Sequence, residues 1–256
     1  MTLRLPTLPG FDLSGQRALI TGAGRGIGLG VATALAQAGA EVFLAARSLG
    51  EISQAADALR DAGMKAHPLQ LDVSDIQNTT VLIHDTGPFD ILVNNAGTNR
   101  PKPVWEVTEG DFDAVMDLNV KAAYFVAKAV ADGLIGAKRP GALIHMSSQM
   151  GQVGAPNRSL YCASKWAMEG MNKALALDLA PHRIRSNTIA PTFIETPLTK
   201  PMFEDETFLE SVLSKIKLGR VGQVSDLMGA VLFLASPSAA MMTGSTLTVD
   251  GGWTAD

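Results

Sequence analysis

The sequence predicts an α/β fold: a single-domain, Rossmann-type, doubly wound parallel sheet with helices on both faces. Short apolar runs alternate with longer segments that have helical spacing, which is the order of elements that builds a parallel sheet. The first apolar run also ends in a glycine-rich turn that leads directly into a helical segment. We expect one domain over residues 1–256, with a leader at 1–13 and a substrate lid at 193–217.

The composition narrows the class of protein. The 256 residues are 46% hydrophobic and 18% charged, which is typical of a globular chain. The net charge is −4 without a Lys/Arg run, so we expect no nucleic-acid partner and no membrane. Cys162 is the single cysteine, which excludes an intramolecular disulfide and fits a reducing compartment. No signal-peptide core or membrane span is apparent, and the scattered histidines predict no metal site, so a cytoplasmic location is expected.

The first part of the chain predicts a nucleotide-binding unit. Residues 18–20 predict a strand and residues 29–38 a helix, with the glycine-rich turn between them. Residues 42–45 predict a second strand, and a helix over 48–62 follows, with Ser48 as its N-cap. Glycines in this setting allow a tight turn and let backbone N–H groups approach a phosphate. The cofactor contacts predicted here are Thr21, Gly22, Gly24, Arg25, Gly26, Ile27 and Gly28.

The end of the second strand predicts which dinucleotide is bound. An NAD site usually carries an acidic residue about 20 residues past the glycine turn, where it bonds the ribose hydroxyls. Here that position holds Ala46, followed by Arg47. Arg47, with Arg25 in the glycine-rich turn, can pair with a 2′-phosphate. The sequence therefore predicts a preference for NADP(H), with NAD(H) possible.

The middle of the chain continues the pattern. Residues 69–73 predict a third strand with Asp72 at its end, and a short helix over 75–84 follows. A fourth strand at 91–93 runs into Asn94-Asn95-Ala96-Gly97, whose small residues suit close approach of a flat ligand, although a plain tight turn is the alternative. A long helix is predicted over 109–134 with Asn119 in its middle. Because asparagine is a poor helix-interior residue, it either bends the helix, bonds a water or lies on the surface.

A fifth strand at 142–146 leads to Ser148, and a helix over 161–180 follows. Tyr161 and Lys165 stand at i and i+4, so they share one face of that helix. A lysine ammonium beside a phenol favours the phenolate and lowers the pKa of the tyrosine. Such a phenol exchanges a proton with an alcohol or carbonyl oxygen, and the Ser148 hydroxyl can bond the same oxygen.

The last third of the chain is predicted to contain the substrate lid. A sixth strand at 184–189 ends in Ala190-Pro191-Thr192, and a helix over 224–235 precedes a last strand at 245–249. The irregular segment between the sixth strand and that helix, 193–217, is either a mobile substrate lid or an ordinary helical connection. The strand-end candidates meet at the carboxyl edge of the sheet, where open α/β sheets bind ligands. The pocket is predicted to be lined by Asn99, Gln149, Met150 and Phe193, with lid residues.

These motifs, taken in order, resemble the short-chain dehydrogenase/reductase family over nearly the whole chain. The resemblance is carried by Thr21-Gly22-x-x-x-Gly26-Ile27-Gly28, Asn94-Asn95-Ala96-Gly97, Asn119, Ser148 and Tyr161-x-x-x-Lys165. Within the family the chain is most similar to gluconate-type sugar-acid dehydrogenases and 3-oxoacyl-carrier-protein reductases.

The resemblance implies roles for individual residues. Tyr161 is the acid/base, Ser148 orients the substrate oxygen, Lys165 binds the nicotinamide ribose and lowers the tyrosine pKa, and Asn119 holds a water of the proton relay. It further implies a homotetramer paired through the helices that carry Asn119 and Tyr161. The remaining cofactor contacts implied are Asp72 and Val73 at the adenine, with Asn95, Ala96, Gly97, Pro191, Thr192, Ile194 and Thr196. Thr192 departs from the family, which usually has glycine after that proline.

The function predicted is an NADP(H)-dependent oxidoreductase that interconverts a ketone and a secondary alcohol, with a small carbonyl or alcohol substrate. An acyl-carrier partner would need a basic entrance, for which Arg100, Lys102, Lys138, Arg139 and Arg158 are candidates. One alternative is a non-catalytic dinucleotide-binding regulatory protein, which would gain nothing from a tuned phenol. Another is a lyase or epimerase on the same fold, which usually needs a longer substrate-binding region.

Overall fold

The computed structural model describes residues 5–255, so residues 1–4 of the predicted leader and residue 256 lie outside the described part. Seven strands form one parallel sheet in the order β3-β2-β1-β4-β5-β6-β7. The sheet therefore confirms the predicted fold class. The strands are β1 (Arg17–Thr21), β2 (Glu41–Ala46), β3 (Ala66–Gln70), β4 (Ile91–Asn94), β5 (Gly141–Met146), β6 (Ile184–Pro191) and β7 (Thr246–Val249).

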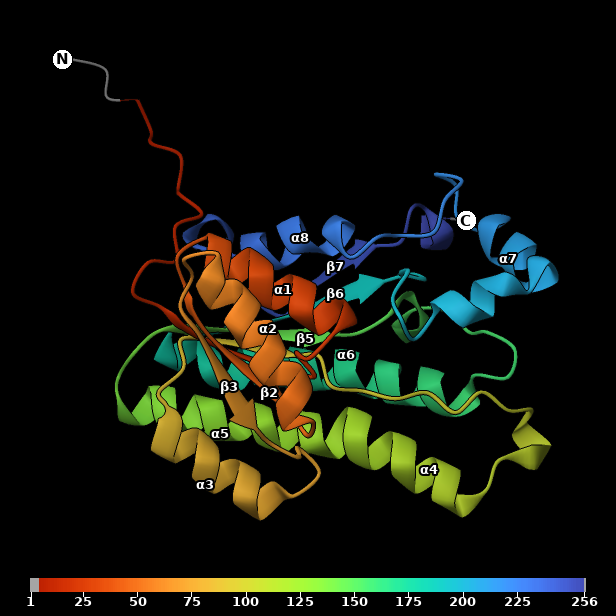
Figure 1. Cartoon of the computed structure of the whole chain (residues 1–256), viewed down its shortest axis with the longest axis horizontal. Helices are drawn as coiled ribbons and strands as arrows, with labels where there is room; N and C mark the ends of the chain where they lie inside the picture. The colour runs from red at the N-terminus through yellow and green to blue at the C-terminus, as the bar shows by residue number, and fades with distance from the viewer. Residues whose placement is uncertain (1–4, 256) are drawn as a thin grey trace.

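Helices cover both faces of the sheet (Figure 1). Helices α1, α2 and α8 pack on one face, and α3, α5 and α6 pack on the other. Helix α7 lies beyond the ends of β6 and β7, within the predicted lid (Figure 1). The helices are α1 (Gly26–Gln37), α2 (Leu49–Asp61), α3 (Ile76–Thr86), α4 (Glu109–Met116), α5 (Ala123–Gly136), α6 (Ser159–Leu179), α7 (Glu206–Leu213) and α8 (Ser225–Ala235).

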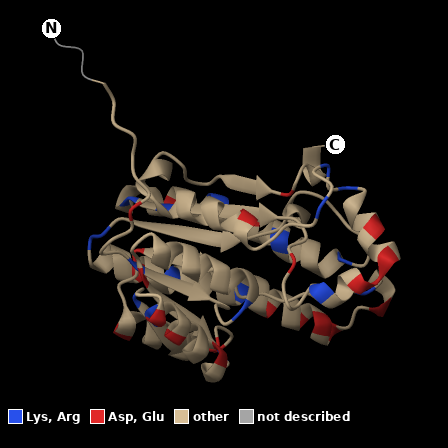
Figure 2. Ribbon diagram, turned by 45° about the horizontal axis from the view of Figure 1, so that its top comes forward, with Lys and Arg blue, Asp and Glu red and all other residues tan. Residues whose placement is uncertain are grey.

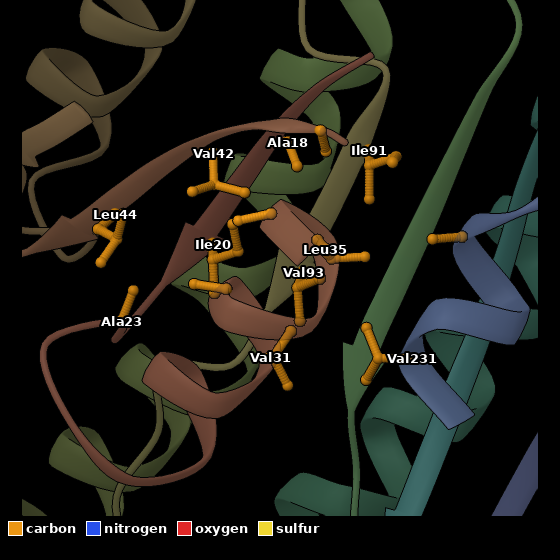
Figure 3. Packing of buried hydrophobic residues seen from close by; sticks show 14 of the residues in the cluster. Ala18, Ile20, Ala23, Val31, Leu35, Val42, Leu44, Ile91, Val93 and Val231 are labelled. Atoms are coloured by element: carbon orange, nitrogen blue, oxygen red, sulfur yellow. The ribbon is translucent and has the colours of Figure 1, made fainter. Parts of the chain in front are cut away.

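The strands are buried on both faces because successive side chains alternate between two hydrophobic clusters. In β1, Ala18 and Ile20 join the cluster under α1, α2 and α8, while Leu19 joins the cluster under α3, α5 and α6. Figure 3 shows the first cluster, where Ile20 of β1 lies among residues of the neighbouring strands and of α1, including Val93 and Leu35. Lys, Arg, Asp and Glu positions lie mostly on the helices and loops rather than on the strands (Figure 2). Within residues 5–255, no helix has the length and apolar character to span a membrane.

Two predicted elements need correction. The third strand occupies Ala66–Gln70 rather than 69–73, because β2 pairs with it from Ala66 onward. It is an edge strand that contains Pro68 and exposed residues, so it lacks the apolar pattern of a buried strand. The prediction instead followed the apolar residues at 69, 71 and 73, which placed the strand too late in the chain. The predicted helix over 109–134 is not uniform, since a turn of π-helix at Asp117–Ala122 separates α4 from α5.

A chain of buried polar side chains crosses the sheet from β4 toward β7. Asn94 donates from Nδ2 to the Ala123 carbonyl (2.8 Å) and to His145 Nδ1 (3.2 Å). His145 Nε2 therefore carries the proton and donates to Ser186 Oγ (3.2 Å), which donates to Asn172 Oδ1 (2.8 Å). Burial lowers the pKa of His145 to about 4. His145 is fully buried within the sheet.

Candidate active site

The glycine-rich turn between β1 and α1 is built for an anion. Gly22 and Gly26 have φ of 65° and 57°, a conformation that side chains rarely adopt. A Cβ atom at Gly28 would collide with the carbonyl oxygen of Gly22, so only glycine lets α1 approach the turn. Helix α1 begins after Arg25 without a side-chain cap and has no acidic residue in its first turn. Its first N–H groups are thus left for a phosphate, and the turn fits a dinucleotide.

Hydrogen bonds join the end of β1 to the end of β4. Thr21 Oγ1 accepts hydrogen bonds from the backbone N–H groups of Asn95 and Ala96, each at 3.0 Å. Asn95 Nδ2 donates to the carbonyl oxygens of Thr21 (3.0 Å) and Gly22 (3.2 Å). A Cβ atom at Gly22 would lie only 3.1 Å from the Cα atom of Ala96. These bonds fix the two strand ends at the point where the strand order reverses, so this part of the predicted site comes together.

The two arginines predicted to bind a 2′-phosphate have different surroundings. Arg25 Nη1 lies 3.5 Å from Glu51 Oε1 of α2, and the two side chains are 67% and 44% exposed. A Cβ atom at Gly24 would lie 2.9 Å from Glu51 Oε2, so this carboxylate rests on the glycine-rich turn. Arg47 is exposed at the end of β2 and makes no ion pair among the described residues. Sequence reasoning missed Glu51 because it lies in the following helix.

The predicted adenine residues follow β3. Asp72 is exposed, and its Oδ1 accepts a hydrogen bond from the Ser74 N–H at 3.0 Å. Val73 is buried, 8% exposed, against the cluster under α3 and α5. The structure therefore places the carboxylate of Asp72 outward at the end of β3, while the Val73 side chain packs inward.

Asn119 lies in the π-helical turn and is fully buried, which excludes the surface alternative. Its Oδ1 accepts from the Thr98 N–H (2.8 Å), and its Nδ2 donates to Thr98 O (2.9 Å) and to Ser164 Oγ (3.0 Å). The Ser164 hydroxyl in turn donates to the carbonyl of Tyr161 (2.8 Å). Asn119 thereby joins the segment after β4 to the first turns of α6, a contact that sequence spacing could not reveal. A Cβ atom at Gly97 would lie 3.2 Å from its Oδ1.

Ser148 ends the connection from β5 and is 6% exposed. Its hydroxyl donates to Gln149 Oε1 (2.7 Å) and accepts from the Met150 N–H (3.1 Å). The Ser148 side chain also lowers the pKa of the Tyr161 phenol. Gln149 and Met150 are buried, at 2% and 5% exposed, and their hydrogen bonds with the Ser148 hydroxyl hold it in place when no ligand is bound. Their predicted contact with substrate stays a prediction.

Tyr161 and Lys165 lie one turn apart in α6, and Lys165 Nζ is 5.4 Å from the centre of the phenol ring. The expectation that the lysine lowers the pKa of Tyr161 was wrong for the chain by itself. Burial raises the pKa of Tyr161, while the Ser148 hydrogen bond and the Arg158 charge act in the opposite direction. Lys165 Nζ donates to the Met146 carbonyl (2.7 Å) at the end of β5, and Lys165 is not among the groups that shift the pKa of Tyr161. Burial lowers the pKa of Lys165 to about 8.

Glu169, one turn beyond Lys165, was missed. Its carboxylate raises the pKa of Lys165 against the larger effect of burial. Oε2 accepts from the hydroxyls of Thr188 (2.8 Å) and Thr246 (2.6 Å), whereas Oε1 is buried without a hydrogen-bond partner among the described residues. The signal was present in the sequence, since Tyr161, Lys165 and Glu169 repeat at four-residue spacing on one face of a helix.

The segment after β6 returns toward the glycine-rich turn. The N–H of Thr192 donates to the Val249 carbonyl (3.2 Å), and its hydroxyl is buried without a partner among the described residues. A Cβ atom at Gly26 would lie 3.5 Å from the side chain of Thr196, so the start of the lid lies over the turn. Pro191 and Ile194 are buried.

The lid contains α7 and a 3₁₀ turn at Lys200–Glu204. Phe193 packs against the rings of Phe203, Phe208 and Trp253, with centroids 5.6 to 6.4 Å apart. This aromatic cluster joins the start of the lid to α7 and the C-terminal turn. Whether the segment moves over a substrate stays a prediction.

The five cations considered for an acyl-carrier partner do not form one patch. Lys102 and Arg100 both pair with the buried Asp111, at 2.7 and 3.1 Å. Lys138 and Arg139 follow α5 and precede β5, which places them at the amino edge of the sheet. Only Arg158 stands next to Tyr161 without a carboxylate partner among the described residues. The same described residues contain no group of three or more His, Cys, Asp or Glu that could hold a metal.

The chain is similar to known proteins over nearly its whole length. The family model described as "Enoyl-(Acyl carrier protein) reductase" matches residues 22–254. L-xylulose reductase of Bos taurus is 37% identical over 243 residues, which cover 95% of this chain and 98% of that protein. Gluconate 5-dehydrogenase of Gluconobacter oxydans (strain 621H) is 38% identical over 248 residues, covering 95% and 96%.

Among solved structures, the gluconate 5-dehydrogenase of Burkholderia cenocepacia J2315 in complex with NADP and tartrate superimposes with a TM-score of 0.93. It is 36% identical, and the match covers 96% of this chain and 98% of that one. Fold, motif order and whole-length similarity agree. The chain belongs to the short-chain dehydrogenase/reductase family of NAD(P)-dependent oxidoreductases.

Proposed function

We propose that the protein is an NADP(H)-dependent oxidoreductase that interconverts a ketone and a secondary alcohol, with Tyr161 as the acid/base. The observation that carries this proposal is the position of the buried Ser148 side chain beside the Tyr161 phenol, whose pKa it lowers, with Lys165 Nζ 5.4 Å from the centre of the phenol ring. These groups lie at the carboxyl edge of the sheet, beside a turn that fits a dinucleotide.

The cofactor, when bound, supplies or accepts the hydride. The uncapped N-terminus of α1 fits its pyrophosphate, and the small residues after β4 leave room for a flat group. The residues that would hold it are Thr21, Gly22, Gly24, Arg25, Gly26, Ile27, Gly28, Arg47, Asp72, Val73, Asn95, Ala96, Gly97, Pro191, Thr192, Ile194 and Thr196.

Each residue of the tetrad has a task that its surroundings support. Ser148 bonds the substrate oxygen, and Tyr161 gives that oxygen a proton during reduction or takes one during oxidation. A phenol with a raised pKa stays protonated at neutral pH, which suits reduction. Lys165 supplies positive charge beside the phenol, and Asn119 fixes the start of α6 through Ser164.

Two features support NADP(H) over NAD(H). Arg25 and Arg47 are exposed at the end of β1 and β2, and no acidic residue occupies the end of β2. A carboxylate there would repel a 2′-phosphate, whereas guanidinium groups bind one. The solved gluconate 5-dehydrogenase with 36% identity contains NADP.

The relatives suggest a polyhydroxylated substrate. They include proteins named for L-xylulose and for gluconate, a ketose and a sugar acid. The dispersal of the five candidate cations argues against an acyl-carrier partner. A polar substrate is consistent with hydrogen-bonding groups such as Ser148 and Asn99 at this edge of the sheet.

Exposed aromatic side chains support the proposed homotetramer. Large apolar side chains are exposed on and beside α4, α5 and α6: Trp105, Phe112, Tyr124 and Trp166. Exposed aromatic groups of this kind mark protein–protein contacts. The oligomeric state and a cytoplasmic location stay predictions.

The test is turnover by the Tyr161→Phe variant. The wild-type protein is assayed with NADPH and NADH against ketones, polyols and sugar acids, by absorbance of the reduced cofactor. Loss of a general acid lowers the rate by about 10²- to 10⁴-fold while cofactor affinity, measured by calorimetry, is retained. Tyr124→Phe removes the hydroxyl of the only other tyrosine, on α5, and serves as the matched control. Near wild-type turnover by Tyr161→Phe would contradict the assignment.

A further inference from the structure

Arg158 occupies a fixed position three residues before Tyr161. Its carbonyl oxygen accepts the N–H of Cys162 at 2.8 Å, so its backbone forms part of the first turn of α6. The preceding residue is tied to the segment after β4, because Lys102 donates its N–H to the carbonyl of Asn157 at 3.1 Å. The guanidinium therefore belongs to a braced part of the chain rather than to a free loop.

The guanidinium of Arg158 has few hydrogen-bond partners for a side chain that is partly buried. Arg158 is partly buried, yet its one side-chain hydrogen bond is from Nη1 to the Asn157 carbonyl, at 3.3 Å. No carboxylate among the described residues pairs with it. By contrast, Arg100 and Lys102, in the segment after β4, each contact an oxygen of Asp111. A partly desolvated cation with most of its N–H donors unused is costly unless a ligand pairs with it.

The charge of Arg158 also reaches the phenol. The guanidinium favours the ionised form of Tyr161, and the phenolate in turn favours the guanidinium. Partial burial lowers the pKa of Arg158, which is consistent with a site shielded from water. Arg158, at the N-terminus of α6, therefore lies within electrostatic range of the phenol to which we assign proton transfer.

We propose that Arg158 binds a carboxylate carried by the substrate, so that the substrate is a keto acid or hydroxy acid of the sugar series rather than a neutral ketose. This inference rests on the proposed function of Tyr161. The planar guanidinium presents two parallel donors that match the two oxygens of a carboxylate. Its single positive charge balances a monoanion better than a phosphate dianion.

The experiment compares two substrates that differ at one carbon. 5-Keto-D-gluconate and L-sorbose share their ketone and hydroxyl pattern, and the carboxylate of the first is a hydroxymethyl group in the second. For the wild type we expect a higher kcat/KM with the acid. In Arg158→Gln the ratio of the two kcat/KM values falls about 10- to 100-fold, as expected for a lost charge-assisted hydrogen bond. Arg158→Lys keeps the charge and retains part of the ratio.

The ratio of the two kcat/KM values separates an effect on carboxylate binding from an effect on the pKa of Tyr161. Any effect of Arg158 on the pKa of Tyr161 changes both substrates alike and cancels in the ratio. Arg183→Gln removes another arginine without a carboxylate partner among the described residues, at the opposite end of α6, and is expected to leave the ratio unchanged. Thermal melting of each variant checks that it folds.

Two outcomes overturn the inference: a ratio in Arg158→Gln equal to that of the wild type, or a wild type that does not favour the acid. Either can occur while other ketones are reduced and Tyr161→Phe is inactive, in which case the proposed function stands and only the carboxylate subsite fails. Full activity of Tyr161→Phe would instead remove the proposed function.

Discussion

The Arg25–Glu51 ion pair sets a testable limit on NADP(H) affinity. Glu51 Oε1 lies 3.5 Å from Arg25 Nη1, and the same carboxylate touches the glycine-rich turn at Gly24. A 2′-phosphate bound by Arg25 would have to share the guanidinium with Glu51 and lie near a negative charge. Glu51→Gln keeps the shape of the side chain and removes that charge.

The size of the effect follows from two contributions. Freeing Arg25 from an exposed ion pair is worth about 0.2 to 1 kcal/mol. Removing a carboxylate about 6 Å from a phosphate in a water-like dielectric adds about 1 kcal/mol, since unit charges at that distance interact by roughly 0.7 kcal/mol. The sum of about 1 to 2 kcal/mol predicts a KM for NADPH about 5- to 30-fold lower. The KM for NADH, which has no 2′-phosphate, is expected to change by less than about twofold.

The assay is steady-state kinetics with both cofactors at low ionic strength, since salt screens exposed charges. Asp57→Asn is the control, because it removes the same charge from the outer part of the same helix, where Asp57 pairs with Arg60. The reasoning is refuted if Glu51→Gln leaves the NADPH KM unchanged, or if Asp57→Asn lowers it equally.

Three further outcomes are expected. Reduction that needs the Lys165 ammonium is present below pH 8 and is lost as pH rises through the Lys165 pKa of about 8. Glu169→Gln removes a charge that raises this pKa, so the alkaline midpoint of kcat/KM is expected to move to lower pH. A midpoint that stays or rises contradicts this. Thr192→Val removes a buried hydroxyl without a partner among the described residues, so the melting temperature of the cofactor-free protein should not fall; a clear drop would reveal an unrecognised bond. Leu134→Ala empties a fully buried position and should cost about 2–5 kcal/mol of stability in denaturant unfolding, with kcat per folded enzyme retained.

The sequence was sufficient where the determinants are local. The glycine-rich turn, the Ser48 cap and the four-residue spacing of Tyr161 and Lys165 are each contained in a short stretch, and each forms as expected. The parallel, doubly wound sheet also followed, because alternating strands and helices with right-handed crossovers allow few arrangements.

The determinants that were missed are non-local. Asn119 finds its partners 21 and 45 residues away, and Lys165 finds the carbonyl of Met146 19 residues away. No periodicity records such contacts, so neither the burial of the asparagine nor the direction of the lysine could be predicted. The same limit explains the pKa of Tyr161, which depends on how deeply α6 packs rather than on the residue four positions along.

The chain of buried polar side chains that crosses the sheet makes the stability of the folded protein depend on pH in the acid range. His145 accepts at Nδ1 and donates at Nε2, so taking up a second proton would break its bond with Asn94. Its pKa is about 4 in the folded chain but near the ordinary 6.5 when unfolded, so the unfolded chain binds more protons between these values. Stability therefore declines as pH falls from 6.5 toward 4. This contribution to acid sensitivity arises in the middle of the sheet, at a side chain that is fully buried.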